Sequence, residues 1–223
     1  MSKSIAIIGM SGTGKSTSVR HLNPNNTFIV SVASKELPFK GSGKSYIPLT
    51  KDGGNLLNTS DSNTVVKTLE YINSNRPEIN TVVIDDAQYL LSYEYMARAK
   101  ETGFNKFTDI AQKHFNLVNL SKALRDDLLI VFMYHPEIDT DALGNKTIKA
   151  KTIGKMLDSA ITLEGMFSIV LYTEVAKTEN GLAYTFVTQN SGNNTGKSPD
   201  GMFDLRIPND LEFVKNKIVE YYN

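Results

Sequence analysis

The residue types that could hold a phosphate chain lie together near the start of the sequence. Residues 9–16 read Gly-Met-Ser-Gly-Thr-Gly-Lys-Ser and match the pattern G-x-x-x-x-G-K-[ST] at every fixed position. Glycine lets the backbone curl so that its N–H groups converge, and the start of a following helix adds donors and partial positive charge. The loop therefore predicts a site for a nucleoside triphosphate, with ATP as the default. The predicted contacts come from Gly9, Met10, Ser11, Gly12, Thr13, Gly14, Lys15, Ser16 and Thr17.

Two side chains of this loop have separate predicted roles. Lys15 would reach the β- and γ-phosphates, and Ser16 would offer its hydroxyl to Mg²⁺. A second magnesium ligand is predicted at Asp85, which ends an apolar run that is typical of a buried strand. Together these residues predict a site for Mg²⁺ and ATP.

The group that would activate water for hydrolysis has several candidates. Asp86 directly follows the magnesium acid, where one large class of ATPases carries the longer glutamate. Glu36 lies just beyond the second predicted strand. His135 follows the third central strand, and either His135 or Tyr134 could sense the γ-phosphate by hydrogen bonding. The alternative for Glu36 is a solvated loop acid, and for His135 it is a turn residue before proline, so the choice stays open.

Four lysines follow the third central strand within a short stretch. They are open to three interpretations: a solvated cationic face, a contact with nucleic acid, or insertion into the ATP site of a neighbouring subunit. These lysines are Lys146, Lys149, Lys151 and Lys155.

Strands that alternate with helices must position these residues. The pattern predicts an α/β fold: a central parallel sheet flanked by helices, with an antiparallel C-terminal extension, in a single domain over 1–223. The predicted strands are 4–8, 27–32, 81–86, 128–134, 167–177 and 182–189, with a hairpin between the last two and another over 138–150. The predicted helices are 16–22, 61–75, about 87–100, about 108–126 and about 209–222.

Two regions are predicted to be loops. Residues 35–60 show no sustained periodicity and predict a long surface excursion. The tripeptide Gly-Lys-Ser recurs at 43–45 and at 196–198, but without the earlier glycine or a preceding apolar strand. Both copies are therefore predicted to lie on polar loops, and neither is a second phosphate site.

Composition limits the class of protein. The chain has 223 residues, of which 40% are hydrophobic and 22% charged, as expected for one folded globular domain. The absence of cysteine excludes disulfides and cysteine metal sites. A formal net charge of +0 argues against a wholly basic surface, so any DNA contact would be local. The sequence has no apolar run of membrane-spanning or signal-peptide length, and a cytoplasmic location is the default expectation.

Nearly the whole chain resembles the RecA-like P-loop ATPases of bacteriophage genomes, often described as AAA-domain or nucleotide-binding proteins. The resemblance is carried by the loop, by the strand that ends in Asp85 and Asp86, and by the strand before His135. More particular matches lie at 36–41, 98–101, 107–108, 149–157 and 197–203.

This resemblance implies ATP hydrolysis coupled to single-stranded DNA in phage recombination or replication, in a homo-oligomer within the host cytoplasm. In RecA-type assemblies a neighbour's lysines complete the ATP site, which favours Lys149, Lys151 or Lys155 as trans-acting residues. The chain departs from the family in lacking a separate DNA-binding domain and in its paired acids, which are closer to the AAA+ pattern.

Two other functions compete with this one. The neutral net charge is compatible with an ATP-dependent switch or assembly factor that acts on protein partners. A small-molecule kinase is disfavoured, because the five arginines are scattered without a paired lid motif.

Overall fold

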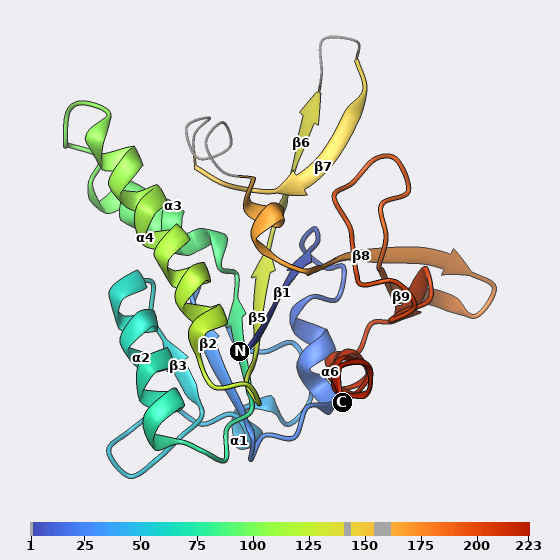
Figure 1. The fold of residues 1–223 in the computed structure, drawn as a ribbon, viewed down its shortest axis with the longest axis horizontal. Helices are drawn as coiled ribbons and strands as arrows, with labels where there is room; N and C mark the ends of the chain where they lie inside the picture. The colour runs from blue at the N-terminus through green and yellow to red at the C-terminus, as the bar shows by residue number, and fades with distance from the viewer. Residues whose placement is uncertain (1, 141–143, 154–161) are drawn as a thin grey trace.

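A mostly parallel sheet forms the centre of the molecule (Figure 1). The computed structural model describes residues 2–140, 144–153 and 162–223. The strands of the central sheet are β1 (Lys3–Ile8), β2 (Thr27–Ser31), β3 (Leu56–Asn58), β4 (Thr81–Asp85), β5 (Leu129–Tyr134), β8 (Ile169–Thr178), β9 (Gly181–Val187) and β10 (Arg206–Pro208). A separate hairpin consists of β6 (Pro136–Thr140) and β7 (Lys146–Ala150).

The order of the strands is β10-β9-β8-β1-β5-β4-β2-β3. The six strands from β8 to β3 run parallel, whereas β9 and β10 add antiparallel pairs beyond β8. Strands β2, β4 and β5 are buried along their whole length, as expected for central strands that are covered on both faces. The predicted α/β fold with a central parallel sheet is thus confirmed.

Helices cover both faces of the sheet and make a three-layer structure. They are η1 (Ser16–His21), α1 (Ser42–Ser45), α2 (Ser62–Asn75), α3 (Gln88–Ala97), α4 (Asn105–Ala123), η2 (Leu163–Met166) and α6 (Leu211–Tyr222). Successive strand residues point to opposite faces. Ile8 and Phe132 therefore pack with α2, α3 and α4, whereas Ile7 and Met133 pack with η1 and α6.

Three local predictions need correction. The helix expected at 16–22 is a short 3₁₀ helix, η1, because Pro24 leaves room for only about two turns after the loop. The 35–60 segment is not only a surface excursion: its strand β3 pairs with β2 and extends the sheet. The tripeptide at 43–45 lies in helix α1 rather than in a flexible loop.

The tripeptide at 196–198 lies outside the helices and strands, as predicted, but it is tied to the sheet. The backbone of Lys197 exchanges hydrogen bonds with Val170 of β8, at N···O distances of 2.8 and 3.0 Å. This bridge holds the segment against the sheet.

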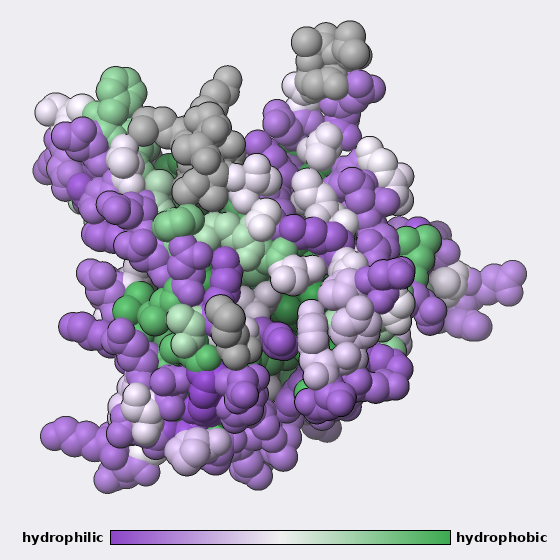
Figure 2. All heavy atoms as spheres, viewed as in Figure 1, coloured by the Kyte–Doolittle hydropathy of each residue, from purple (hydrophilic) through white to green (hydrophobic). Residues whose placement is uncertain are grey.

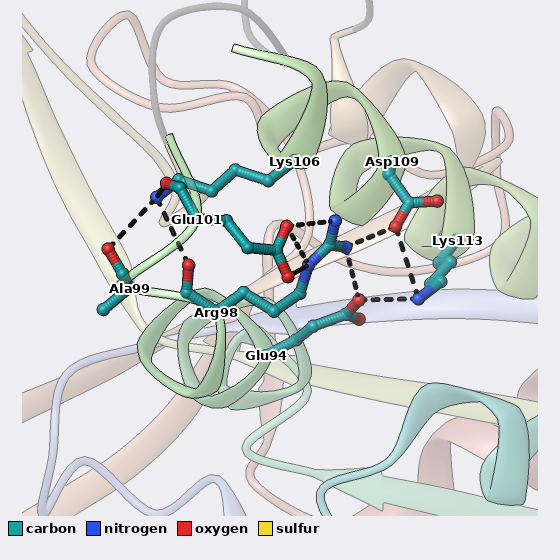
Figure 3. A network of polar contacts seen from close by, with 7 residues as sticks. All are labelled: Glu94, Arg98, Ala99, Glu101, Lys106, Asp109 and Lys113. Atoms are coloured by element: carbon teal, nitrogen blue, oxygen red, sulfur yellow. Dashed lines mark hydrogen bonds and ion pairs between the residues drawn. The ribbon is translucent and has the colours of Figure 1, made fainter. Parts of the chain in front are cut away.

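A network of charged side chains joins the outer ends of α3 and α4 (Figure 3). The guanidinium of Arg98 pairs with Glu94, Glu101 and Asp109, so it is held between the two helices. Lys113 Nζ lies 2.6 Å from Glu94 Oε1 and adds a second link. Hydrophilic residues dominate this end in Figure 2, apart from a hydrophobic patch near the α3–α4 connection, where Met96 and Phe104 are exposed.

A buried histidine on α4 should make stability depend on pH. His114 is 1% exposed, its Nε2 lies 2.9 Å from the Tyr134 hydroxyl, and burial lowers its pKa to about 4. The unfolded chain, with an ordinary histidine pKa of 6.5, binds a proton as the pH falls below that value, whereas the folded chain does so only near pH 4. We expect the free energy of unfolding to fall by about 2 kcal/mol between about pH 7.5 and pH 5.

Urea unfolding at both pH values measures this change. The variant His114→Gln cannot titrate but retains polar atoms for Tyr134, so it should lose most of the pH dependence. An equal pH dependence in both proteins would contradict the assignment.

Candidate nucleotide-binding site

A pocket of about 530 Å³ opens where the carboxyl ends of the parallel strands meet. The phosphate loop follows β1, Asp85 ends β4, and His135 follows β5, so strands far apart in the sequence converge here. Strand β5 lies between β1 and β4, which puts the loop and the acids on opposite sides of one strand. The loop contributes six residues to the lining: Ser11, Gly12, Gly14, Lys15, Ser16 and Thr17.

The loop backbone has the curled form that its glycines predict. Gly12 and Gly14 have φ angles of +78° and +96°, a region that residues with a Cβ rarely adopt. Three predicted contact residues do not line the pocket and instead support the loop. Thr13 Oγ1 lies 2.6 Å from Thr173 Oγ1 on β8, and the backbone carbonyls of Gly9 and Met10 accept hydrogen bonds from Lys15.

Gly9 is required for a different reason, which is the close approach of β8. A Cβ added at Gly9 would lie 1.8 Å from Thr173 Oγ1, so a Gly9→Ala variant must displace the loop or β8. We expect it to lower the free energy of unfolding by about 1–3 kcal/mol and to weaken nucleotide binding. Urea unfolding of a double-mutant cycle with Thr173→Gly checks the cause: the cost of Gly9→Ala should shrink once Thr173 has no side chain. An unchanged cost would exclude this contact as the reason.

Lys15 is held within the loop. Its Nζ donates hydrogen bonds to the carbonyl oxygens of Gly9 at 2.7 Å and Met10 at 3.0 Å, and the residue is 5% exposed. Burial lowers the pKa of Lys15, while the carboxylates of Asp86 and Asp85 act in the opposite direction. Phosphate oxygens are better acceptors for this ammonium than neutral carbonyls, because the hydrogen bonds would be charge-assisted on both sides.

Ser16 and Asp85 come together as the sequence predicts. Ser16 Oγ donates a hydrogen bond of 2.9 Å to Asp85 Oδ1, and Asp85 is 8% exposed. Burial raises the pKa of Asp85, and the adjacent charge of Asp86 raises it further. A hydroxyl beside a buried carboxylate fits Mg²⁺, which takes one or two carboxylates with phosphate oxygens and water, and whose charge would offset the cost of ionising Asp85.

Asp86 is held by two side chains. Lys35 Nζ lies 2.9 Å from Oδ2, and His135 Nε2 lies 3.0 Å from Oδ1. Burial opposes ionisation, but the hydrogen bonds from His135 and Lys35 outweigh it and lower the pKa of Asp86 to about 2. The backbone of Asp86 has a φ of +59°, a left-handed conformation that aspartate tolerates better than most residues. The chain thus fixes an ionised carboxylate beside the predicted metal ligand.

The other candidate residues lie in different surroundings. Glu36 lines the pocket as an exposed residue at its rim. The interpretation of Tyr134 as a phosphate sensor is wrong, because this side chain is 0% exposed and its hydroxyl contacts His114 in the core.

The predicted trans-acting lysines lie on or just after the β6–β7 hairpin. Lys149 Nζ lies 3.3 Å from both Glu137 Oε1 and Asp139 Oδ2, within its own hairpin. The backbone N–H of Lys151 donates to the carbonyl of His135 at 2.8 Å. Lys155 lies outside the described residues.

Five lining residues were not predicted as site residues: Arg20, Lys35, Pro38, Tyr184 and Asn209. Lys35 could have been found, because it follows the strand that ends beside β4 and directly precedes Glu36. Tyr184 and Asn209 carry no local signal, since only the packing of the antiparallel extension brings them to the loop.

A glycine-rich loop after β1 that faces strand-end carboxylates across one pocket defines a P-loop nucleotide-binding protein. The sequence model of a family described as an AAA domain matches residues 1–199, and the chain belongs to this family. Membership indicates a nucleotide-binding ATPase. No curated protein matches the chain. In the part of the chain that the structure describes, no helix has the length and apolarity needed to cross a membrane.

Proposed function

We propose that this single-domain protein hydrolyses ATP with Mg²⁺ in the pocket at the carboxyl edge of the sheet. The observation that carries the proposal is that Lys15, the Ser16–Asp85 pair and Asp86 line the same pocket. Lys15 and the loop N–H groups hold the β- and γ-phosphates. Ser16 and Asp85 hold Mg²⁺, which neutralises charge on the phosphates when bound.

Asp86 is the proposed catalytic group. A carboxylate with a pKa of about 2 is a weak base, so its main contribution is to orient the attacking water. This suits phosphoryl transfer, whose loose transition state needs positioning and charge stabilisation more than early proton removal. Lys35 supplies a cation within the same chain, 2.9 Å from Asp86, and can stabilise charge at the γ-phosphate.

Single-stranded DNA is the proposed partner of a RecA-like homo-oligomer, as the resemblance to phage ATPases implies. The β6–β7 hairpin supports this extension because it starts directly after His135, which contacts Asp86. The hairpin carries Lys146 and Lys149, and Lys151 follows it. DNA bound along these lysines would move His135, and His135 would in turn change the position of the Asp86 carboxylate that it contacts.

The rate of phosphate release with and without single-stranded DNA at low salt tests this part. We expect stimulation that declines as salt is added, because phosphate contacts release counterions. Unchanged hydrolysis without DNA binding would exclude the DNA partner and favour a switch that acts on proteins. ADP release that occurs only when an acceptor is added would indicate a kinase, because the phosphoryl group then passes to the acceptor.

Mixed oligomers test which lysine acts from a neighbour. A Lys151→Ala subunit should restore hydrolysis to a Lys15→Ala partner if Lys151 acts in trans, and Lys149 and Lys155 can be tested in the same way. Lys35→Met should give no such rescue, because Lys35 and Lys15 line the pocket of one chain. Rescue by Lys35→Met would contradict its proposed role.

A further inference from the structure

The pocket has two chemically different ends. Strand β1 divides the sheet, with β5, β4 and β2 on one side and β8, β9 and β10 on the other. Asp85, Asp86 and His135 lie on the first side, whereas Tyr184 and Asn209 line the pocket from the second. This inference rests on the proposed function: if the γ-phosphate faces the acids, the nucleoside extends toward Tyr184 and Asn209.

Tyr184 offers an aromatic surface at this end. It lies on β9, opposite Val175 of β8, and is 40% exposed. A planar base can stack on such a ring whatever its identity, because every base has a π face. Tyr184 therefore provides affinity for a nucleoside without selecting the base.

The side-chain amide of Asn209 is buried, yet it makes no hydrogen bond to any of the described residues. It directly follows β10, is 3% exposed, and its backbone N–H donates to the carbonyl of Tyr184 at 3.4 Å. Among the described residues, neither Oδ1 nor Nδ2 has a hydrogen-bond partner. The amide packs on the phosphate loop, since a Cβ added at Gly14 would lie 2.9 Å from Oδ1. A buried donor and acceptor left unpaired are costly, which points to a ligand that pairs with them.

We propose that Tyr184 and Asn209 form the base subsite and that Asn209 selects adenine. A carboxamide presents a donor beside an acceptor, and adenine presents the complementary pair at N7 and the N6 amino group. Guanine presents two acceptors, N7 and O6, on the same edge. The base contact requires the amide to rotate about its side-chain bonds, so that the donor and acceptor now packed against Gly14 face the base.

Competition binding with ATP, GTP and inorganic tripolyphosphate tests the subsite. The wild-type protein should bind ATP about tenfold or more tightly than GTP, the effect of one bidentate contact. Asn209→Leu, which has nearly the same volume but no donor or acceptor, should remove most of this preference. Tyr184→Ala should weaken ATP and GTP alike by about tenfold, whereas Tyr184→Phe should bind as the wild type does. Tripolyphosphate, which has no base, should bind all four proteins equally.

Other outcomes separate this inference from the proposed function. Equal affinity of the wild-type protein for ATP and GTP, with normal tripolyphosphate binding, overturns the base subsite and leaves the phosphate site intact. Loss of tripolyphosphate binding in the Tyr184 or Asn209 variants also overturns it, because the damage would then be structural. If the wild-type protein binds none of the three compounds, the proposed function itself fails. The wild-type comparison needs no variant, so it stands even if Asn209→Leu does not fold.

Discussion

Replacing Lys15 with methionine is expected to lower ATP hydrolysis by at least about 10²–10³-fold, the usual effect of removing one donor that stabilises transition-state charge. Methionine fills similar space but cannot donate a hydrogen bond or carry charge. The ammonium lies inside the pocket wall, 5% exposed, where its interaction with phosphate is screened less than at the surface. Phosphate release at saturating ATP, together with ATP affinity, measures the effect.

The chain provides a matched control for this change. Lys44 also stands within a Gly-Lys-Ser tripeptide, but it lies exposed on α1 and does not line the pocket. Lys44→Met should therefore leave hydrolysis within about twofold of the wild type, since surface substitutions away from a site have small effects. Equal losses in the two variants would contradict the assignment of the loop.

Folding is expected to survive the Lys15 substitution. Burial of the ammonium is unfavourable, as the lowered pKa of Lys15 shows, and methionine removes that cost. The carbonyls of Gly9 and Met10 lose the hydrogen-bond donor that Lys15 supplies, and this loss destabilises the folded protein. Because these two terms oppose each other, a large change in the free energy of unfolding would indicate that the loop has rearranged.

The parts of the site that depend on chain-local patterns could be predicted from the sequence. Gly12, Gly14, Lys15 and Ser16 form one continuous motif, and Asp85 ends an apolar strand that only the centre of a parallel sheet can bury. Their meeting in space follows from the rule that the carboxyl ends of parallel strands share one edge. The Ser16–Asp85 contact is thus a consequence of topology as much as of motif.

The remaining parts depend on tertiary packing that no local pattern records. The positive φ of Asp86 turns its carboxylate toward Lys35 and His135, and backbone conformation at one residue cannot be read from its type. The segment at 35–60 lacks periodicity because β3 has only three residues, yet it closes the edge of β2. Asn209 reaches the phosphate loop only through the order of β8, β9 and β10.

Replacing Asp86 with asparagine is expected to reduce kcat by about 10²–10⁴-fold while ATP affinity changes little, because the carboxylate acts on water rather than on the bound nucleotide. Asparagine suits this position, since it has nearly the same shape and also tolerates the left-handed conformation with a φ of +59°. The change removes the charge that pairs with Lys35 and replaces one of the two carboxylate oxygens, which would orient the attacking water, with a donor.

Glu36→Gln is the matched test of the competing base. Glu36 lines the same pocket but is exposed at its rim, so this variant should keep kcat within about threefold of the wild type. Single-turnover hydrolysis with prebound ATP separates the chemical step from binding. A loss in Glu36→Gln with activity retained in Asp86→Asn would transfer the catalytic role to Glu36. The distinction is physical: hydrogen bonds from Lys35 and His135 fix the position of the Asp86 carboxylate, whereas Glu36 is exposed at the rim of the pocket.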